Sequence, residues 1–130
     1  MIVDTSALIA ILRQEPEAER LARAMANDPV RLISAANWLE AGLVIFVRVG
    51  KEGTRDLDLL IAKYHLEAAP VTAKQAAIAR RAFMQYGKGI HPASLNFGDC
   101  FSYALAKDTG EPLLFKGSDF GRTDVGVVAY

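Results

Sequence analysis

Short apolar segments alternate with longer segments of helical periodicity along most of this chain. The apolar segments are expected to be strands, and they lie at residues 2–4, 31–33, 65–71, 113–115 and 125–129. In most of the intervening stretches apolar residues recur every three or four positions, which is typical of helices. Strands separated by helices pair in parallel and are covered on both faces. The alternation therefore predicts an α/β fold, a Rossmann-like parallel sheet of about five strands flanked by helices on both faces.

Six helices are expected between these strands. The first contains Leu8–Leu12 and the second follows Pro16, and the others run from Ser34 to about Val49, from Thr54 to Tyr64, from Thr72 to about Tyr86 and from Phe97 to about Thr109. Ser34 and Thr72 are residue types that accept hydrogen bonds from the free N–H groups at the start of a helix. Gly50 is typical of the position just after a helix end.

The composition indicates one domain. The chain has 130 residues, 52% of them hydrophobic, which is enough for a sizeable core, and we expect a single domain over residues 1–130. No apolar run approaches the roughly 20 residues of a membrane span, and the N-terminus lacks the basic start of a signal peptide, so a cytoplasmic location is expected. Cys100 is the only cysteine and is expected to be a buried, unreactive thiol.

The overall charge gives no sign of a nucleic-acid-binding protein, because 15 basic and 15 acidic residues cancel. The local distribution is less even. Between Glu67 and Asp99 there is no acidic residue, and the four basic residues of that segment are Lys74, Arg80, Arg81 and Lys88. The segment is either an ordinary solvated helix face or an edge that contacts phosphates.

Four carboxylates, Asp4, Glu40, Asp99 and Asp119, stand at the edges of apolar segments, where a charge has no obvious structural purpose. Asp4 and Asp99 have an alternative interpretation as residues that cap the helices they precede or open. Asp119 has an alternative as a solvated acid in a turn. The ends of parallel strands meet at one edge of a sheet, and we expect these carboxylates to form one acidic pocket there.

Glu40 is harder to explain structurally. Between Ala35 and Val49 the only other charged residue is Arg48, and the apolar residues surround the helix rather than forming a stripe. A helix that is apolar all round is expected to be buried. A buried carboxylate is costly without a partner, so Glu40 needs a metal ion, a hydroxyl group or an arginine beside it.

A cluster of carboxylates predicts a divalent cation. Bringing three or four of them within about 4 to 6 Å costs several kcal/mol of repulsion unless a cation lies between them. Oxygen ligands suit Mg²⁺ or Mn²⁺, which polarise phosphoryl oxygens and activate water, and phosphodiester hydrolysis is the chemistry this predicts. The hydroxyl groups of Thr5 and Ser6 could contact Asp4 or a metal-bound water, or could cap the helix.

Three segments carry a resemblance to a known family. These are residues 2–8 (IVDTSAL), Glu40 six residues after Ser34, and residues 96–106 (NFGDCFSYALA). In order and spacing they resemble the PIN-domain nucleases, and more narrowly the VapC toxins. The resemblance implies a Mg²⁺-dependent endoribonuclease, with Mn²⁺ as a possible alternative, that is the toxin of a type II toxin-antitoxin system. It further implies an RNA substrate, a cognate VapB-type antitoxin and a homodimer.

The resemblance also assigns site residues. Asp4, Glu40 and Asp99 correspond to metal-binding acids of the family. Asp119 corresponds less closely, because many relatives have Thr and then Asp or Asn where this chain has Phe115 and Gly117.

A mechanistic hypothesis follows from these assignments. In it, Asp4 and Asp99 anchor the ion, Glu40 orients or deprotonates the attacking water, and Asp119 completes the metal shell or a second site. The basic residues that could contact phosphates are Lys116, Arg122 and Lys88, and ordinary loop solubility is the alternative for each.

Other classes of protein fit less well. A phosphoacceptor receiver module needs an Asp after its third strand, where this chain has Pro70–Thr72, and a haloacid-dehalogenase-type phosphatase needs a second Asp at the position of Ser6. The alternatives that stay open are a PIN-domain protein of RNA maturation and one that binds RNA without cutting it.

Overall fold

The computed structural model describes all of residues 1–130. Four parallel strands form one sheet in the order β3-β2-β1-β4, and they are β1 (Ile2–Val3), β2 (Leu32–Ser34), β3 (Glu67–Ala69) and β4 (Leu113–Leu114). The helices are α1 (Thr5–Leu12), α2 (Ala18–Asn27), α3 (Ala35–Val49), α4 (Lys51–Lys63), α5 (Ala73–Tyr86) and α6 (Phe97–Thr109), followed by a short 3₁₀ helix at Phe120–Arg122. The expected α/β class and six helices are confirmed.

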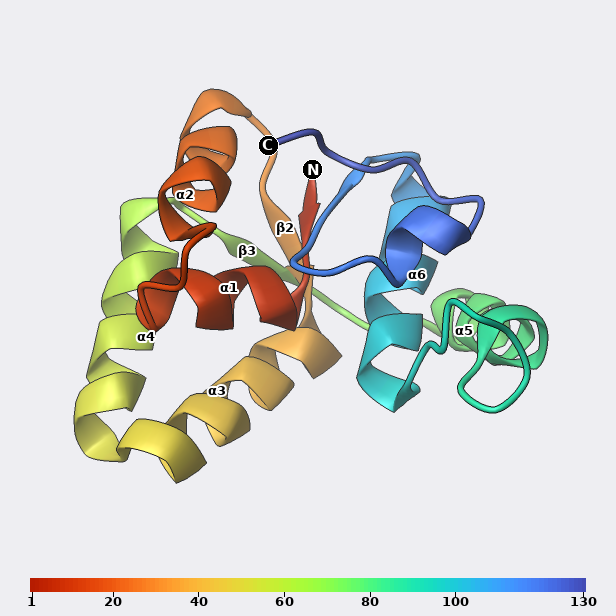
Figure 1. Cartoon of the computed structure of the whole chain (residues 1–130), viewed down its shortest axis with the longest axis horizontal. Coiled ribbons are helices and arrows are strands. Elements are labelled where there is room, and N and C mark those ends of the chain that lie inside the picture. Colours follow the sequence, from red (N-terminus) through yellow and green to blue (C-terminus); the bar gives the residue numbers. More distant parts are fainter.

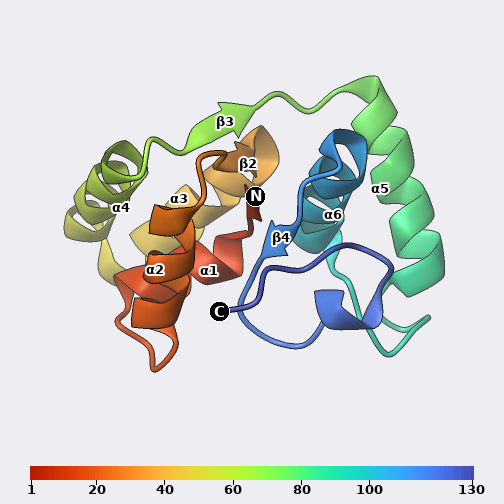
Figure 2. The same cartoon turned by 90° about the horizontal axis from the view of Figure 1, so that it is seen from above.

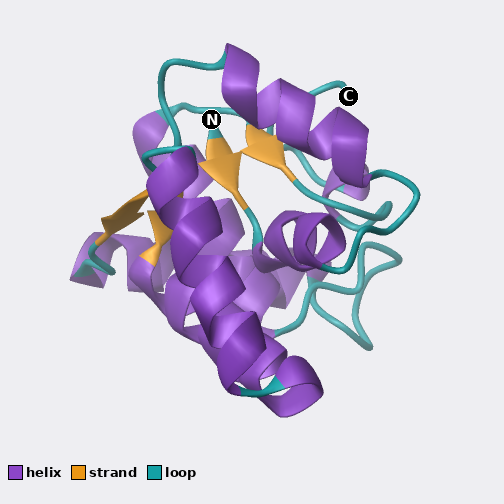
Figure 3. Cartoon of the chain, turned by 90° about the vertical axis from the view of Figure 1, so that its left-hand side faces the viewer, coloured by secondary structure: helices purple, strands orange, loops and turns teal.

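The sheet separates two groups of helices. Helices α1 to α4 lie on one side and α5 and α6 on the other (Figure 1, Figure 2). Figure 3 shows that the strands are short and that helices make up most of the fold. No helix is both long enough and apolar enough to cross a membrane.

The alternation of side chains along the strands divides the core in two. Successive residues of a strand point to opposite faces of the sheet. Ile2 and Leu113 accordingly pack in the cluster on the α5 and α6 side, while Val3 and Leu114 pack in the cluster on the α1 to α4 side. These pairs are also in register, with Ile2 opposite Leu113 and Val3 opposite Leu114.

The sheet has four strands, because the expected strand at 125–129 pairs at one position only. Leu113 donates to the carbonyl of Gly126 at 2.8 Å and accepts from the N–H of Val128 at 3.0 Å, which forms a single parallel bridge to Val127. Val127 is 48% exposed, so burial does not stabilise a longer strand there.

The strands expected at 2–4, 31–33 and 113–115 differ from the observed ones by one residue at one or both ends, and two larger differences have local reasons. The third strand is shorter than 65–71, because His65 has a positive φ of 48° and Pro70 has no N–H to donate to a neighbouring strand. The fourth helix begins at Lys51, before Thr54, because Gly50 reverses the chain at φ 80° and α4 follows at once. The expected end of α3 at Val49 is confirmed.

The expectation that α3 is buried is wrong for this chain alone. Only Asn37, Ala41 and Ile45 of this helix are buried. The large apolar residues that α3 exposes are Trp38, Leu39, Leu43, Phe46, Val47 and Val49. One side of the helix packs on the fold, and nothing in this chain covers the other side.

Gly53 sets how closely α4 approaches α3. A Cβ atom at Gly53 would lie 2.7 Å from the Cβ of Val49 and 2.9 Å from Cγ1 of Ile45. The Gly53→Ala variant is therefore expected to lower the free energy of unfolding by about 1–3 kcal/mol, because overpacking forces the helices apart.

Gly42 is the matched control, because a Cβ there meets nothing within 4 Å. Gly42→Ala is expected to raise the free energy of unfolding by about 0.5–1 kcal/mol through helix propensity. Urea unfolding of the two variants measures both effects, and changes of the same sign would contradict this account of the α3–α4 contact.

Candidate active site

A polar cavity of about 370 Å³ opens where β1 ends and α1 begins. Ligands of open parallel sheets bind at this edge, beyond the carboxyl ends of the strands. The lining residues come from α1, α3, the start of α6 and the loops after α1 and β4, and they are Asp4, Thr5, Ser6, Ile9, Glu15, Glu40, Val44, Arg48, Asn96, Asp99 and Lys116. Asp4, Glu40 and Asp99 thus lie around the same cavity, as expected.

Asp4 is held in place by two hydrogen bonds and is 3% exposed. Its Oδ2 accepts from the N–H of Ser6 at 2.9 Å, which is the helix cap considered as an alternative function. Its Oδ1 accepts from the hydroxyl of Ser102 at 2.5 Å. The Asp4 carboxylate therefore caps α1 and lines the cavity at the same time, so the two interpretations of this residue are compatible.

A buried polar network joins Asp4 to the other helices of the site. The hydroxyl of Ser102 also lies 3.0 Å from Oδ1 of Asn37. The Nδ2 of Asn37 donates to the carbonyl of Gly98 at 2.9 Å and to Oε1 of Glu40 at 3.4 Å. Asn37 is fully buried and Ser102 is 1% exposed, so the network links α1, α3 and α6 out of reach of water.

Asp99 opens α6 in a capping box. Its backbone N–H donates to Oδ1 of Asn96 at 2.8 Å, and its Oδ2 accepts from the N–H of Asn96 at 2.9 Å. The pKa of Asp99 is raised to about 7, mainly by burial and also by the negative charges of Asp4, Asp119 and Glu40, while the hydrogen bond from the Asn96 N–H acts in the opposite direction. The carboxylates are therefore close enough to repel one another.

Glu40 lies against the backbone of α6, and Gly98 makes this approach possible. A Cβ atom at position 98 would overlap Oε2 of Glu40 and would lie 2.8 Å from its Cδ. Within the chain Glu40 accepts a hydrogen bond from the Asn37 amide, at a long 3.4 Å, and pairs with neither of the expected protein groups, a hydroxyl or an arginine. Its carboxylate is half-buried and faces the cavity.

Asp119 stands apart from the other three acids. It is exposed and does not line the cavity, although its charge contributes to the raised pKa of Asp99. It precedes the 3₁₀ helix at Phe120–Arg122.

The expected phosphate contacts are not assembled around the cavity. Lys116 lines it, but its ammonium group pairs with Glu15 and lies 3.4 Å from Glu17. Lys88 and Arg122 are exposed and lie outside the lining. In the basic segment of α5, Lys74 pairs with Asp108 at 2.8 Å.

The hydroxyl groups of Thr5 and Ser6 are also engaged by the protein. Thr5 donates to the carbonyl of Asn37 at 3.2 Å. Ser6 accepts from the backbone N–H of Lys116 at 3.0 Å, which joins α1 to the loop after β4. Both residues therefore help to build the walls of the cavity.

The donor set of the cavity fits a hard divalent cation. Its candidate ligands are carboxylate oxygens, which Mg²⁺ and Mn²⁺ prefer. Burial is the main cause of the raised pKa of Asp99, and the charges of Asp4, Asp119 and Glu40 add to it, so a cation would offset part of the effect. In the structure as it stands, no three His, Cys, Asp or Glu side chains are close enough to hold one ion together. Asp4 approaches the cavity from the turn between β1 and α1, Glu40 from α3 and Asp99 from the first turn of α6.

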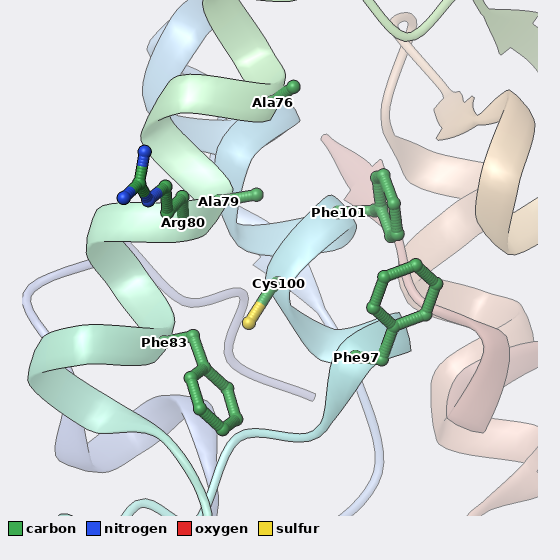
Figure 4. A pocket seen from close by; sticks show the side chains of 7 residues that line it. All are labelled: Ala76, Ala79, Arg80, Phe83, Phe97, Cys100 and Phe101. Carbon is green, nitrogen blue, oxygen red and sulfur yellow. The ribbon is translucent and has the colours of Figure 1, made fainter.

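A second, apolar cavity of about 470 Å³ lies between α5 and α6 (Figure 4). Its lining residues are Ala76, Ala79, Arg80, Phe83, Phe97, Cys100 and Phe101. The expected burial of Cys100 is confirmed, and burial raises the pKa of its thiol to about 11, which disfavours the reactive thiolate.

Comparison with known proteins identifies the family. The PIN domain family matches residues 1–126. Ribonuclease VapC of Mycolicibacterium smegmatis is 55% identical over 128 residues, which are 98% of this chain and 99% of that protein. The chain belongs to the PIN-domain family of VapC ribonucleases. The resemblance found in the sequence is thereby confirmed.

Solved structures agree with the fold of this VapC-family chain. VapC20 of Mycobacterium tuberculosis, described as a toxin that cleaves the sarcin-ricin loop, superimposes with a TM-score of 0.79 at 18% identity, over 99% of this chain and 98% of that chain. VapBC2 of Rickettsia felis, bound to a DNA fragment from its promoter, gives a TM-score of 0.75 at 16% identity, over 98% and 96% of the two chains. At these identities the likeness concerns the fold alone.

Sequence reasoning missed Asn37, Ser102, Gly98 and Arg48 as residues of the VapC-family site. Asn37 precedes Glu40 by three residues, and Ser102 follows Asp99 by three. Residues three apart share one face of a helix, so this spacing was the available signal for the two buried polar residues. No pattern in the sequence shows that Gly98 meets Glu40.

Replacing Asp99 with Asn is expected to stabilise the metal-free protein more at high pH than at low pH. Folding raises the pKa of Asp99 from 3.8 to about 7. Between these pH values the folded chain holds a proton that the unfolded chain has released. The Asp99 carboxyl therefore lowers the free energy of unfolding progressively as the pH rises, and the effect reaches its full size above about pH 7. Asn removes this penalty and keeps an oxygen that accepts from Asn96.

Urea unfolding of both proteins with chelator, at about pH 5 and about pH 8, measures this difference. The gain in free energy of unfolding on Asp99→Asn should be larger at the higher pH. An equal gain at both pH values, or a loss at the higher one, would contradict the raised pKa of Asp99 in the folded chain.

Proposed function

We propose that this chain is a Mg²⁺-dependent endoribonuclease, with Mn²⁺ as a possible substitute, and the toxin of a type II toxin-antitoxin system. The observation that carries the proposal is the meeting of Asp4, Glu40 and Asp99 around one cavity, with a pKa of about 7 for Asp99. Membership of the VapC ribonuclease family supports it.

Asp4, Glu40 and Asp99 would hold the cation, and Asp119, which lies outside the lining, would contribute through its negative charge. The cation would supply polarisation of a phosphoryl oxygen and activation of water. Asp4 is oriented for this by the N–H of Ser6 and the hydroxyl of Ser102. Glu40 would accept a proton from the attacking water, and its half-buried position beside the cavity supports this role.

An antitoxin and an RNA substrate are the proposed partners. The similar VapBC2 structure of Rickettsia felis supports an antitoxin of VapB type, as a proposal for this chain. RNA follows from the ribonuclease family to which the chain belongs. Because an RNA substrate lies in the cytoplasm, we propose that location for the protein.

We also propose a homodimer, because a broad apolar surface has no partner within the chain. Phe97 and Phe101 border both the α5–α6 cavity and a second apolar hollow formed with α3. That hollow also contains Leu39 and Leu43, which are 55% and 59% exposed. A continuous exposed apolar surface of this kind is typical of a protein interface.

Cleavage of a small-RNA pool tests the nuclease function. The purified protein is expected to give discrete fragments with Mg²⁺ or Mn²⁺, and none with chelator. Asp99→Asn, prepared identically, should lower the rate by at least about a hundredfold, because it removes a charged ligand from the cavity.

The control is mass spectrometry of the preparation, which excludes a co-purified antitoxin. If the wild type and Asp99→Asn behave alike with every RNA and metal, the nuclease assignment fails, and binding of RNA without cutting becomes the better explanation. A role in RNA maturation would be favoured if the fragments were those of precursor processing and if expression of the protein in cells caused no general loss of translation.

Gly98→Ala tests the role of Glu40 without changing a charge. The added methyl group would overlap the Glu40 carboxylate, which ends a flexible side chain and can move away. The melting temperature should therefore change little, while the cleavage rate should fall by about tenfold or more, because catalytic groups depend on exact placement. Gly42→Ala on the same helix as Glu40 is the control, and equal activity of the two variants would contradict the proposed role.

A further inference from the structure

Arg48 is the one basic side chain of the carboxylate cavity that the protein leaves without a partner. Only Arg48 and Lys116 are basic among the lining residues. Lys116 pairs with Glu15 and Glu17, and the hydrogen bond to Glu15 raises the pKa of Lys116. Arg48 has no such acid and forms none of the ion pairs in the chain.

The position of Arg48 on α3 directs it to the same cavity as Glu40. Glu40, Val44 and Arg48 follow one another at four-residue spacing, and all three line the cavity. Residues at this spacing share one helix face. Eight residues correspond to a rise of about 12 Å along the same wall. Arg48 is exposed and Glu40 half-buried, which puts Arg48 nearer the rim.

The chemistry of arginine suits a phosphate at this rim. Its planar guanidinium group carries five donors that match a phosphate in a bidentate geometry. A cavity bordered by Asp4, Glu40 and Asp99 repels a polyanion, and a cation at the edge offsets that repulsion. Lys116 would first have to release two carboxylates, whereas Arg48 has none to release.

We propose that Arg48 binds a backbone phosphate of the RNA that flanks the bond to be cut. This inference rests on the proposed function and assigns Arg48 to binding the substrate, with Glu40 and the other carboxylates left to the chemistry. Arg48 therefore contributes mainly to KM and to the salt dependence of binding.

Kinetics of Arg48→Ala and Arg48→Lys on an RNA that the wild type cleaves test the inference. Arg48→Ala is expected to raise KM by about tenfold, because hydrogen bonds to charged groups are strong, with kcat within about twofold of wild type. Arg48→Lys should bring KM part of the way back to the wild-type value, since lysine keeps the positive charge but cannot bind a phosphate in the bidentate geometry of arginine. The slope of log KM against log salt should become shallower by about 0.7, the value for one phosphate of a single strand.

Arg55→Ala is the matched control. Arg55 is also an exposed arginine without an ion pair, but it lies on α4 outside the cavity. Unchanged KM and salt slope are expected for this variant. If Arg48→Ala equals Arg55→Ala, or if it lowers kcat while KM stays constant, the inference about Arg48 is overturned and the nuclease function stands.

Binding of a fluorescein-labelled single-stranded RNA separates this inference from the proposed function. Fluorescence anisotropy with Asp99→Asn protein measures affinity without cleavage. The double variant Asp99→Asn with Arg48→Ala should bind about tenfold more weakly than Asp99→Asn alone. Equal affinities would overturn the role of Arg48, whereas absence of cleavage by the wild type, with this difference in affinity retained, would overturn only the nuclease function.

Discussion

The pairing of β1 on both of its sides is the constraint on which the rest of the structure depends. The strand has only two residues, Ile2 and Val3, and it lies between β2 and β4 in the sheet. Because the two side chains point to opposite faces, one enters each core cluster. The next residue, Asp4, leaves the sheet at its carboxyl end and starts α1, so the packing of the sheet determines where this carboxylate lies.

The buried polar network shows how the protein holds charges that repel one another. Asp4 is anchored by Ser6 and Ser102, and Asn37 connects Ser102 to Glu40 and to the backbone of α6. These neutral donors stabilise the carboxylates without cancelling their charge. The network therefore preserves an electrostatic strain in the cavity, and a bound cation is the partner that would relieve it.

Features set by local chemistry were predicted well from the sequence. The two ends of α3 were predicted from Ser34 and Gly50, and the start of α5 from Thr72, because helix caps and stops depend on a few adjacent residues. Features that depend on contacts between distant parts of the chain were not predicted. The pattern at 125–129 does not show that only one position pairs with β4, and the apolar surroundings of Glu40 do not distinguish burial within the chain from a surface left for another molecule. The family resemblance identified Asp4, Glu40 and Asp99, but it said nothing of the pairing of Lys116 with Glu15.

The contact between Gly98 and Glu40 has a consequence for how such a gene varies under selection. One added carbon at this position disturbs a carboxylate of the cavity and leaves the core clusters untouched. If the chain is a toxin, the product of such a mutation is a folded protein with reduced harmful activity that still presents its surface to the antitoxin. In a cell that makes both forms, the weakened form would occupy antitoxin, so this mutation would leave more of the fully active toxin free.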